Sequence, residues 1–195
     1  MLQAQFKLGS ETYSIIALGS NGQERVEDNL KEVESSLKDI EQAGLRILNQ
    51  SSFYQTPCFP AGAGPDFVNA VVIVESDKSA RAILDRLHEI EHDRGRIRAK
   101  RWGQRVIDID LLAKGEQVCP DADTVLRWVH LPLNEQLEKA PDQLILPHPR
   151  IQDRGFVLVP LVEIAPDWRH PVLGLSAKEM LEALPAQEMA EIKRL

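Results

Sequence analysis

The stretch GRIRAKRWGQRVIDID, Gly95–Asp110, places a dense run of cationic residues directly before two aspartates in alternate positions. The apolar and β-branched residues from Val106 to Leu112 predict a strand. Side chains of a strand point alternately to opposite faces, so Asp108 and Asp110 are expected on one face and the apolar residues beside them on the other. The two Cα atoms would lie roughly 7 Å apart, within reach of one small cation.

The aspartate pair predicts a magnesium site. Two neighbouring carboxylates repel each other, and one of them tends to take up a proton unless a cation lies nearby. Mg²⁺ prefers hard oxygen ligands and usually keeps water and substrate phosphate in its other positions. Alone, the pattern also fits two solvated acids on the polar face of a half-buried strand. The adjoining basic loop favours a metal and phosphate site.

The composition limits the classes of function. The 195 residues are enough for one domain with a sizeable core, and we expect a single domain over residues 1–195. The net charge of −7 gives no general attraction to nucleic acid or anionic membrane, so neither is an expected partner. Cys58 and Cys119 match neither a disulfide framework nor a zinc pair. With no signal peptide or membrane span in view, we expect a cytoplasmic monomer.

Hydrophobic periodicity predicts an α+β sandwich with an antiparallel-rich sheet flanked by helices. Strands are expected at 13–18, 46–54, 67–75 and 106–112, and helices at 79–93 and along one apolar stripe, Val26, Leu30, Val33, Leu37 and Ile40. Several strands follow one another without crossover helices, which favours α+β over a doubly wound fold. A capping box at Ser176–Glu179 predicts a last helix.

Two loops stand out between these elements. Residues 56–66 are rich in Gly and Pro and too long for a tight hairpin, and such loops in compact domains are more often functional than connective. Residues 119–143 are polar and contain three prolines. We expect this second segment to be an excursion from the core with one short helix.

The helix at 79–93 contains a zinc-protease pattern that its geometry argues against. His88-Glu89-Ile90-Glu91-His92 satisfies H-E-x-x-H, but the position of a third histidine ligand is Arg98, which cannot bind zinc. On a helical wheel His92 and Glu89 point away from the buried arc. The same wheel directs Glu91, with His88 at the edge of the arc, towards the body of the protein. Two roles for Glu91 are open: an ion pair with an arginine that serves the structure, or a contact with a ligand.

Six ordered blocks carry a more specific pattern: ALGSN (17–21), SFYQTP (52–57), DFVNA (66–70), residues 95–112, LPHPR (146–150) and RGFVL (154–158). Together they resemble the 6-hydroxymethyl-7,8-dihydropterin pyrophosphokinases of folate biosynthesis, and the similarity spans Tyr13 to about Leu184. The resemblance implies a ferredoxin-like α/β sandwich. It also implies transfer of pyrophosphate from ATP to the pterin hydroxymethyl group, with AMP released.

The resemblance assigns roles to individual residues. Asp108 and Asp110 would hold two Mg²⁺ ions and, with Arg96 and Arg105, form the catalytic set. The residues matching ATP contacts are His88, Glu91, Arg98, Trp102, Arg105, His148 and Arg154. The residues matching pterin contacts are Thr56, Pro57, Phe59, Phe67, Asn69, Trp102 and Phe156.

The pterin assignments agree with the chemistry of the side chains. Phe67 and Phe156 would sandwich the flat ring, and the amide of Asn69 offers donors and acceptors to its polar edge. For each aromatic residue, packing in the core is the alternative. No side chain stands out as a general base, and none is needed as a nucleophile, since phosphoryl-type transfer asks mainly for alignment and charge neutralisation.

The sequence departs from the family pattern on the nucleotide side. Gln104 stands where a proline is frequent, residues 119–143 are longer than usual, and Gln143 and Ile145 replace expected polar residues, which affects the predicted adenine contacts. A pterin-binding paralogue without transfer activity is therefore one alternative. A second is a module that binds single-stranded RNA through its basic, Trp-containing loop.

Overall fold

The computed structural model describes residues 10–58, 64–95, 105–132, 135 and 139–195. Within these ranges the core is a six-stranded sheet in the order β5-β1-β4-β3-β6, with β2 also paired to β4. Each of these pairings is antiparallel. The strands are β1 (Tyr13–Ser20), β2 (Arg46–Gln50), β3 (Tyr54–Thr56), β4 (Phe67–Glu75), β5 (Asp108–Lys114) and β6 (Lys193–Arg194).

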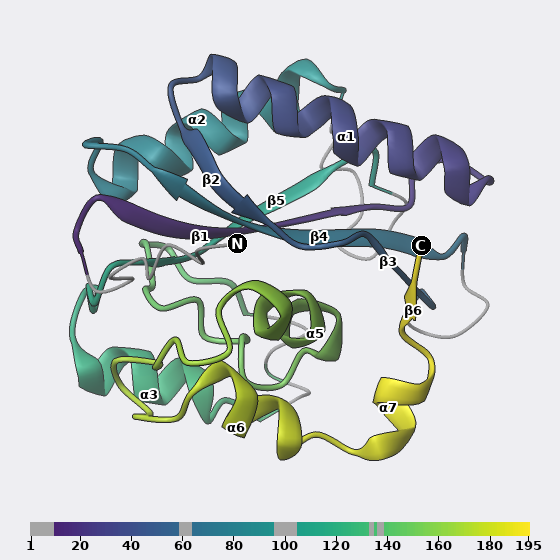
Figure 1. Cartoon of the computed structure of the whole chain (residues 1–195). Helices are drawn as coiled ribbons and strands as arrows, with labels where there is room; N and C mark the ends of the chain where they lie inside the picture. Colours follow the sequence, from purple (N-terminus) through teal and green to yellow (C-terminus); the bar gives the residue numbers. More distant parts are fainter. Residues whose placement is uncertain (1–9, 59–63, 96–104, 133–134, 136–138) are drawn as a thin grey trace, which may run out of the picture.

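Helices cover both faces of this sheet (Figure 1). On one face lie α1 (Val26–Gln42) and α2 (Ala80–Asp93). On the opposite side lie α3 (Ala122–Val129), α5 (Gly155–Ile164), α6 (Ala177–Glu182) and α7 (Ala186–Ala190). The predicted α+β sandwich with an antiparallel-rich sheet is therefore confirmed.

The alternation of side chains along the strands divides the core into two hydrophobic clusters. Ile16, Val72 and Ile109 belong to the cluster beneath α1 and α2. Val71 and Leu112 belong to the cluster beneath α5 and α6. Asn69 of β4 and Asp108 and Asp110 of β5 lie on the same face of the sheet as this second cluster, the face that α5 covers.

Several element boundaries differ from the prediction. The expected strand at 46–54 is divided into β2 and β3, because the Ser51 hydroxyl, rather than a backbone carbonyl, accepts the N–H of Val71 at 3.0 Å. β1 continues to Ser20, and β5 begins at Asp108 instead of residue 106. In contrast, β4 has the predicted bounds, and Ser79 caps α2 by accepting the N–H of Ala82.

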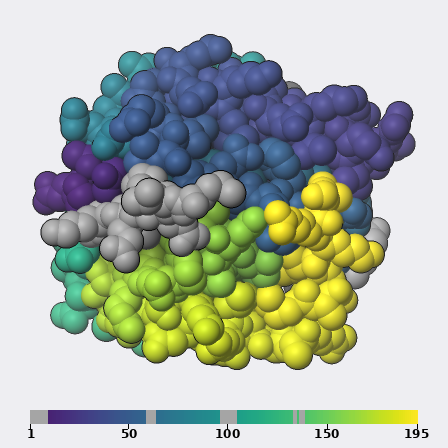
Figure 2. Space-filling model, viewed as in Figure 1, coloured from purple at the N-terminus to yellow at the C-terminus, as the bar shows by residue number. Residues whose placement is uncertain are grey.

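The C-terminal part contains both confirmed and unpredicted elements. The capping box of Ser176 and Glu179 begins α6 as predicted. α7 and β6 were not predicted. β6 pairs with β3, and Figure 2 shows the C-terminal residues in yellow on the surface, next to residues coloured blue. Residues 119–143 contain the expected short helix, α3. No helix in the described ranges is long and apolar enough to cross a membrane.

Candidate active site

The two aspartates lie on the face of the sheet that α5 covers. Asp108 pairs in register with Gly19 of β1, and Gly19 pairs with Asn69 of β4, so these residues form one row across three strands. Ile109 and its apolar neighbours belong to the opposite hydrophobic cluster, as the alternation predicts. Asp110 occupies the next position on the same face, paired with Ala17.

Gly19 leaves room for the side chain of its neighbour. A Cβ atom at Gly19 would lie 2.8 Å from Oδ1 of Asn69 and 3.7 Å from Cδ1 of Phe67. Real Cβ atoms essentially never approach an oxygen so closely, and Oδ1 belongs to a buried, hydrogen-bonded amide. The absence of a side chain at residue 19 therefore leaves the space that Oδ1 of Asn69 occupies.

Each aspartate is paired with an arginine. The Arg105 guanidinium donates a hydrogen bond to Asp108, and Nη1 of Arg154 lies 3.6 Å from Oδ2 of Asp110. All four side chains are part-exposed. The structure thus brings together four predicted site residues from β5, the segment before it and the N-terminus of α5. The repulsion expected within the acid pair is offset by these two cations.

His148 lies beside this charged cluster as a neutral imidazole. Burial, together with the nearby charge of Arg154 and against the opposing effect of Asp108, lowers its pKa to about 3. Its backbone N–H donates to the carbonyl of Leu112 at 2.8 Å, which fixes it to the end of β5. Its Nδ1 accepts the backbone N–H of Arg150 at 3.2 Å. A neutral ring that accepts at Nδ1 carries its proton on Nε2, so His148 offers a hydrogen-bond donor there.

α2 has the predicted orientation except at one residue. Glu91 is 2% exposed, and its Oε1 accepts the backbone N–H of Ile109 at 2.8 Å, between the two aspartates in sequence. His92 faces solvent, and Glu89 pairs with Arg86 on the surface, as the wheel predicts. His88 is exposed, so the expectation that it faces the body of the protein is wrong. His88 lies at the edge of the buried arc of α2, and its side chain is on the solvent side of that edge.

The predicted pterin residues lie on the same face, around Asn69. Asn69 is buried, and its Nδ2 donates to Oγ1 of Thr56 at 2.8 Å, which leaves Oδ1 over Gly19. Phe67 is half-buried and Phe156 is 38% exposed. Neither aromatic side chain is thus enclosed in the core, which counts against packing as its main role.

Four of the predicted residues lie outside the described residues. They are Phe59, Arg96, Arg98 and Trp102. Of the remaining pterin set, Pro57 is exposed and follows directly after β3.

A buried polar network holds the loops around this face, and the sequence prediction missed its role. Oδ1 of Asn21 accepts the N–H of Arg105 at 2.9 Å, and Nδ2 of Asn21 donates to the carbonyl of Pro65 at 3.3 Å. The N–H of Asn21 also donates to the carbonyl of Arg105 at 3.1 Å. One side chain therefore joins the segment before β5 to the segment before β4.

Asn29 supports the same junction from α1. It is fully buried, and its amide accepts from the Ser20 hydroxyl and donates to the carbonyls of Gln23 and Asp66. The sequence signal was a polar residue beside the apolar stripe of α1 together with the ALGSN block, but neither shows which groups it binds.

The chemistry of the donors fits a magnesium ion. Asp108 and Asp110 provide hard oxygen ligands on one face. Within the described ranges no group of three or more histidines, cysteines and acids could hold a metal. Asp108 and Asp110 would hold the metal here, with its other ligands from water and phosphate.

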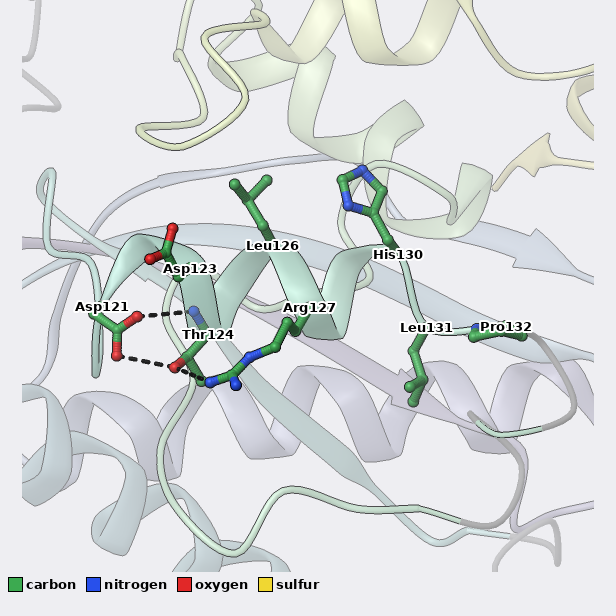
Figure 3. A pocket seen from close by; sticks show the side chains of 8 residues that line it. All are labelled: Asp121, Asp123, Thr124, Leu126, Arg127, His130, Leu131 and Pro132. Atoms are coloured by element: carbon green, nitrogen blue, oxygen red, sulfur yellow. Dashed lines mark hydrogen bonds between the residues drawn. The ribbon is translucent and has the colours of Figure 1, made fainter.

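Two hollows lie away from Asp108 and Asp110. One of about 820 Å³ is an open hollow on α3, lined among the described residues by residues 121–132; Figure 3 shows Asp121, Thr124 and Arg127 joined there by hydrogen bonds. A second, of about 340 Å³, includes Pro57 and Asp66 together with the C-terminal segment. The first cavity contains none of the predicted site residues.

Comparison with known proteins identifies relatives over most of the chain. A family model described as 7,8-dihydro-6-hydroxymethylpterin-pyrophosphokinase (HPPK) matches residues 15–166. A 2-amino-4-hydroxy-6-hydroxymethyldihydropteridine pyrophosphokinase of Haemophilus influenzae is 35% identical over 153 residues, 78% of this chain and 81% of the relative. The enzyme of the same name from Pseudomonas aeruginosa is 35% identical over 172 residues, 87% of this chain and 90% of the relative.

Solved structures show the same fold. A triple mutant of Plasmodium falciparum HPPK-DHPS with STZ-DHP matches with a TM-score of 0.65 and 15% identity, covering 97% of this chain and 47% of the other. The chain therefore spans about half the length of that structure.

Proposed function

Because the chain belongs to the 7,8-dihydro-6-hydroxymethylpterin-pyrophosphokinase family, we propose that it transfers pyrophosphate from ATP to the hydroxymethyl group of 6-hydroxymethyl-7,8-dihydropterin, in folate biosynthesis. The observation that carries the proposal is the row formed by Asp108, Gly19 and Asn69 on one face of the sheet. In this row the aspartates and their arginines, which suit a polyphosphate, lie next to the Asn69 amide, which suits the polar edge of a heterocycle.

In this reaction the pterin hydroxyl oxygen attacks the β-phosphorus of ATP. The bond from that phosphorus to the bridging oxygen of the α-phosphate breaks, AMP leaves with that oxygen, and the proton of the pterin hydroxyl is released to water. Such transfer depends on alignment and charge neutralisation more than on covalent chemistry by the protein. Arg105 and Arg154, now paired with aspartates, are the cations in place to bind the phosphates. His148 would donate from Nε2 to an acceptor of the nucleotide.

Asp108 and Asp110 would hold Mg²⁺, with two ions expected. When bound, the metal neutralises charge on the transferring phosphates. The chain's own part is to hold both carboxylates on one face, which β5 does, and Glu91 supports this by binding the N–H between them.

On the pterin side, Asn69 would bind the polar edge of the ring. Because Thr56 holds the amide by Nδ2, Oδ1 is directed and available to accept a hydrogen bond. Phe67 and Phe156 would stack against the two ring faces. Phe59 and Pro57 complete the proposed pterin set, with Trp102 shared between both substrates.

The remaining nucleotide set follows from the family alone. Arg96 and Arg98 would bind phosphate, and His88 and Glu91 would contact the nucleotide. The exposed position of His88 is compatible with a ligand contact at the surface but not with the inward direction expected from the wheel.

The test is AMP formation by the purified protein with ATP, Mg²⁺ and the hydroxymethyl dihydropterin. We expect one AMP for each pterin consumed, and none when the pterin is omitted, which separates transfer from ATP hydrolysis. Pterin binding without AMP would instead support the inactive paralogue. Retention of single-stranded RNA at physiological salt, with no AMP formed, would support the RNA-binding module.

A further inference from the structure

The excursion at 119–143 is closed at its base beside the candidate site. The N–H of Cys119 donates to the carbonyl of Leu146 at 2.8 Å, and the N–H of Leu146 donates back to Cys119 at 3.0 Å. Two residues after this neck comes His148, which is bound to Leu112 of β5. The excursion therefore begins and ends next to the segment 148–154, which contains His148 and Arg154.

Arg150 connects this segment to the helix of the excursion. It is 8% exposed, and its Nη1 donates to the carbonyl of Val129 at 3.3 Å. Val129 is the last residue of α3, where carbonyl groups lack partners within the helix and a cation is favoured by the helix dipole. The same guanidinium lies 3.5 Å from Asp153. The buried side chain of Arg150 thus links the end of α3 to Asp153 in the segment 148–154.

The backbone of Arg150 also determines the state of the neighbouring imidazole. Its N–H donates to Nδ1 of His148, which places the ring proton on Nε2. A shift of Arg150 would therefore change both the position of residues 148–154 and the donor that His148 offers.

We propose that Arg150 is a positioning residue for the nucleotide, and that α3 of the excursion acts as a brace by providing its acceptor, the Val129 carbonyl. This inference rests on the proposed function, since it assigns His148 and Arg154 to the nucleotide. It gives the excursion a role in the site although the large hollow on α3 contains no predicted site residue. Ile151 is fully buried in the core, so the segment stays attached without Arg150 but loses its fixed geometry.

The test compares Arg150→Met and Arg150→Lys with Arg127→Met. Arg127 is the matched control, because it is an exposed arginine of α3 that, among the described residues, donates only within that helix, to Thr124 (Figure 3). In Arg150→Met we expect the KM for ATP to rise roughly tenfold, as for loss of one charged hydrogen bond, with less than about a twofold change in the KM for the pterin. Arg150→Lys should recover part of the loss, and Arg127→Met should match the parent.

Hydrogen exchange of the ligand-free protein tests whether the contact of Arg150 with α3 holds residues 148–154 in place, and it requires no activity measurement. Amides of residues 151–154 should exchange faster in Arg150→Met than in the parent or in Arg127→Met. If the parent forms no AMP, the proposed function fails, but this measurement still decides whether Arg150 holds residues 148–154 in place. Unchanged exchange, an equal rise of both KM values, or a lower Tm with an unchanged KM ratio would each overturn the proposal.

A second variant removes the acceptor instead of the arginine. Replacing residues 121–143 by a short Gly-Ser linker keeps the Cys119–Leu146 neck and the Arg150 side chain. If α3 is the brace, this variant shows the same rise in the KM for ATP as Arg150→Met, and the combined variant is no worse than either, because both changes break one interaction. Additive effects would mean that Arg150 and α3 act separately.

Discussion

The Arg154 guanidinium lies 3.6 Å from the Asp110 carboxylate and 5.6 Å from the centroid of the Phe156 ring. Arg154 is the N-cap of α5 and Phe156 is in its first turn. The start of one helix therefore links the aspartates of β5 to an aromatic side chain proposed to bind the pterin. This relationship explains how two substrates could meet on one face of the sheet.

Asp110→Asn should lower the rate of AMP formation by at least about 100-fold, corresponding to about 3 kcal/mol of lost transition-state stabilisation. The amide keeps the size of the side chain but removes the charge that would hold Mg²⁺. The free energy of unfolding should change by less than about 1 kcal/mol, because the pair with Arg154 is part-exposed. Steady-state AMP production across a Mg²⁺ titration, with a urea melt of each variant, measures both effects.

Asp123→Asn is the control for this change, since Asp123 is exposed on α3. It should leave turnover and its Mg²⁺ dependence as in the parent. Near-normal turnover of Asp110→Asn at saturating Mg²⁺ would remove the metal site from the proposed function.

Phe156→Ala should weaken pterin binding by about 1 kcal/mol or more, roughly fivefold in Kd, because it removes one face of the proposed stack. The Tm should fall little, since the ring is 38% exposed. Phe53→Ala is the opposite control: Phe53 packs against the core cluster under α1 and α2, so its loss should lower the Tm and leave the pterin Kd unchanged. Calorimetry with the pterin and thermal melts separate the two. A Phe156→Ala variant that binds pterin normally would exclude the sandwich.

Asn21→Ala should raise the KM for both substrates. The change leaves the N–H of Arg105 and the carbonyl of Pro65 without their side-chain partner, at a cost of about 1–3 kcal/mol each if they stay buried. Asn49→Ala is the matched control, because in the described part of the chain the Asn49 side chain bonds only to the N–H of its neighbour, Gln50. Steady-state kinetics with each substrate varied in turn checks the result. An effect of Asn21→Ala on one substrate alone would contradict the view that Asn21 joins the two loops.

Features that depend on local sequence could be predicted, and those that depend on distant partners could not. β4 follows from an uninterrupted run of mostly apolar, β-branched residues, and α2 follows from the helical spacing of its apolar residues. The common face of Asp108 and Asp110 follows from strand geometry, and the inward direction of Glu91 follows from the helical wheel. The break between β2 and β3 depends instead on a hydrogen bond from Val71 to Ser51, which no local pattern contains.

The candidate site shows the same division. The family blocks contained Asn21 and Asn69, but the groups that orient them come from other segments, Pro65 and Thr56. The connection from Arg150 to α3 is invisible in the sequence because its acceptor is a backbone carbonyl. β6 likewise forms only because the end of the chain reaches the exposed edge of β3.

The stability of the fold should depend on pH through the buried histidine His170. His170 is fully buried, its Nδ1 accepts the N–H groups of Val172 and Leu173, and its ring packs edge-on against Trp168. Burial lowers the pKa of His170 to about 4, whereas an imidazole in an unfolded chain titrates near 6.5. Between these values the unfolded chain binds more protons than the folded one. Its contribution to stability is therefore present above pH 6.5 and is lost as the pH falls towards 4.

His170→Asn tests this dependence, because the amide oxygen can replace Nδ1 as acceptor but does not titrate. In the parent, the preferential protonation of His170 in the unfolded chain should lower the free energy of unfolding by at most about 3 kcal/mol as the pH falls from 6.5 to 4. The variant should lack this contribution to the pH dependence. Urea unfolding followed by Trp fluorescence at several pH values gives both curves, with His92→Asn as an exposed control. Parallel curves for the parent and His170→Asn would show that the buried ring is protonated in the folded protein as easily as in the unfolded chain.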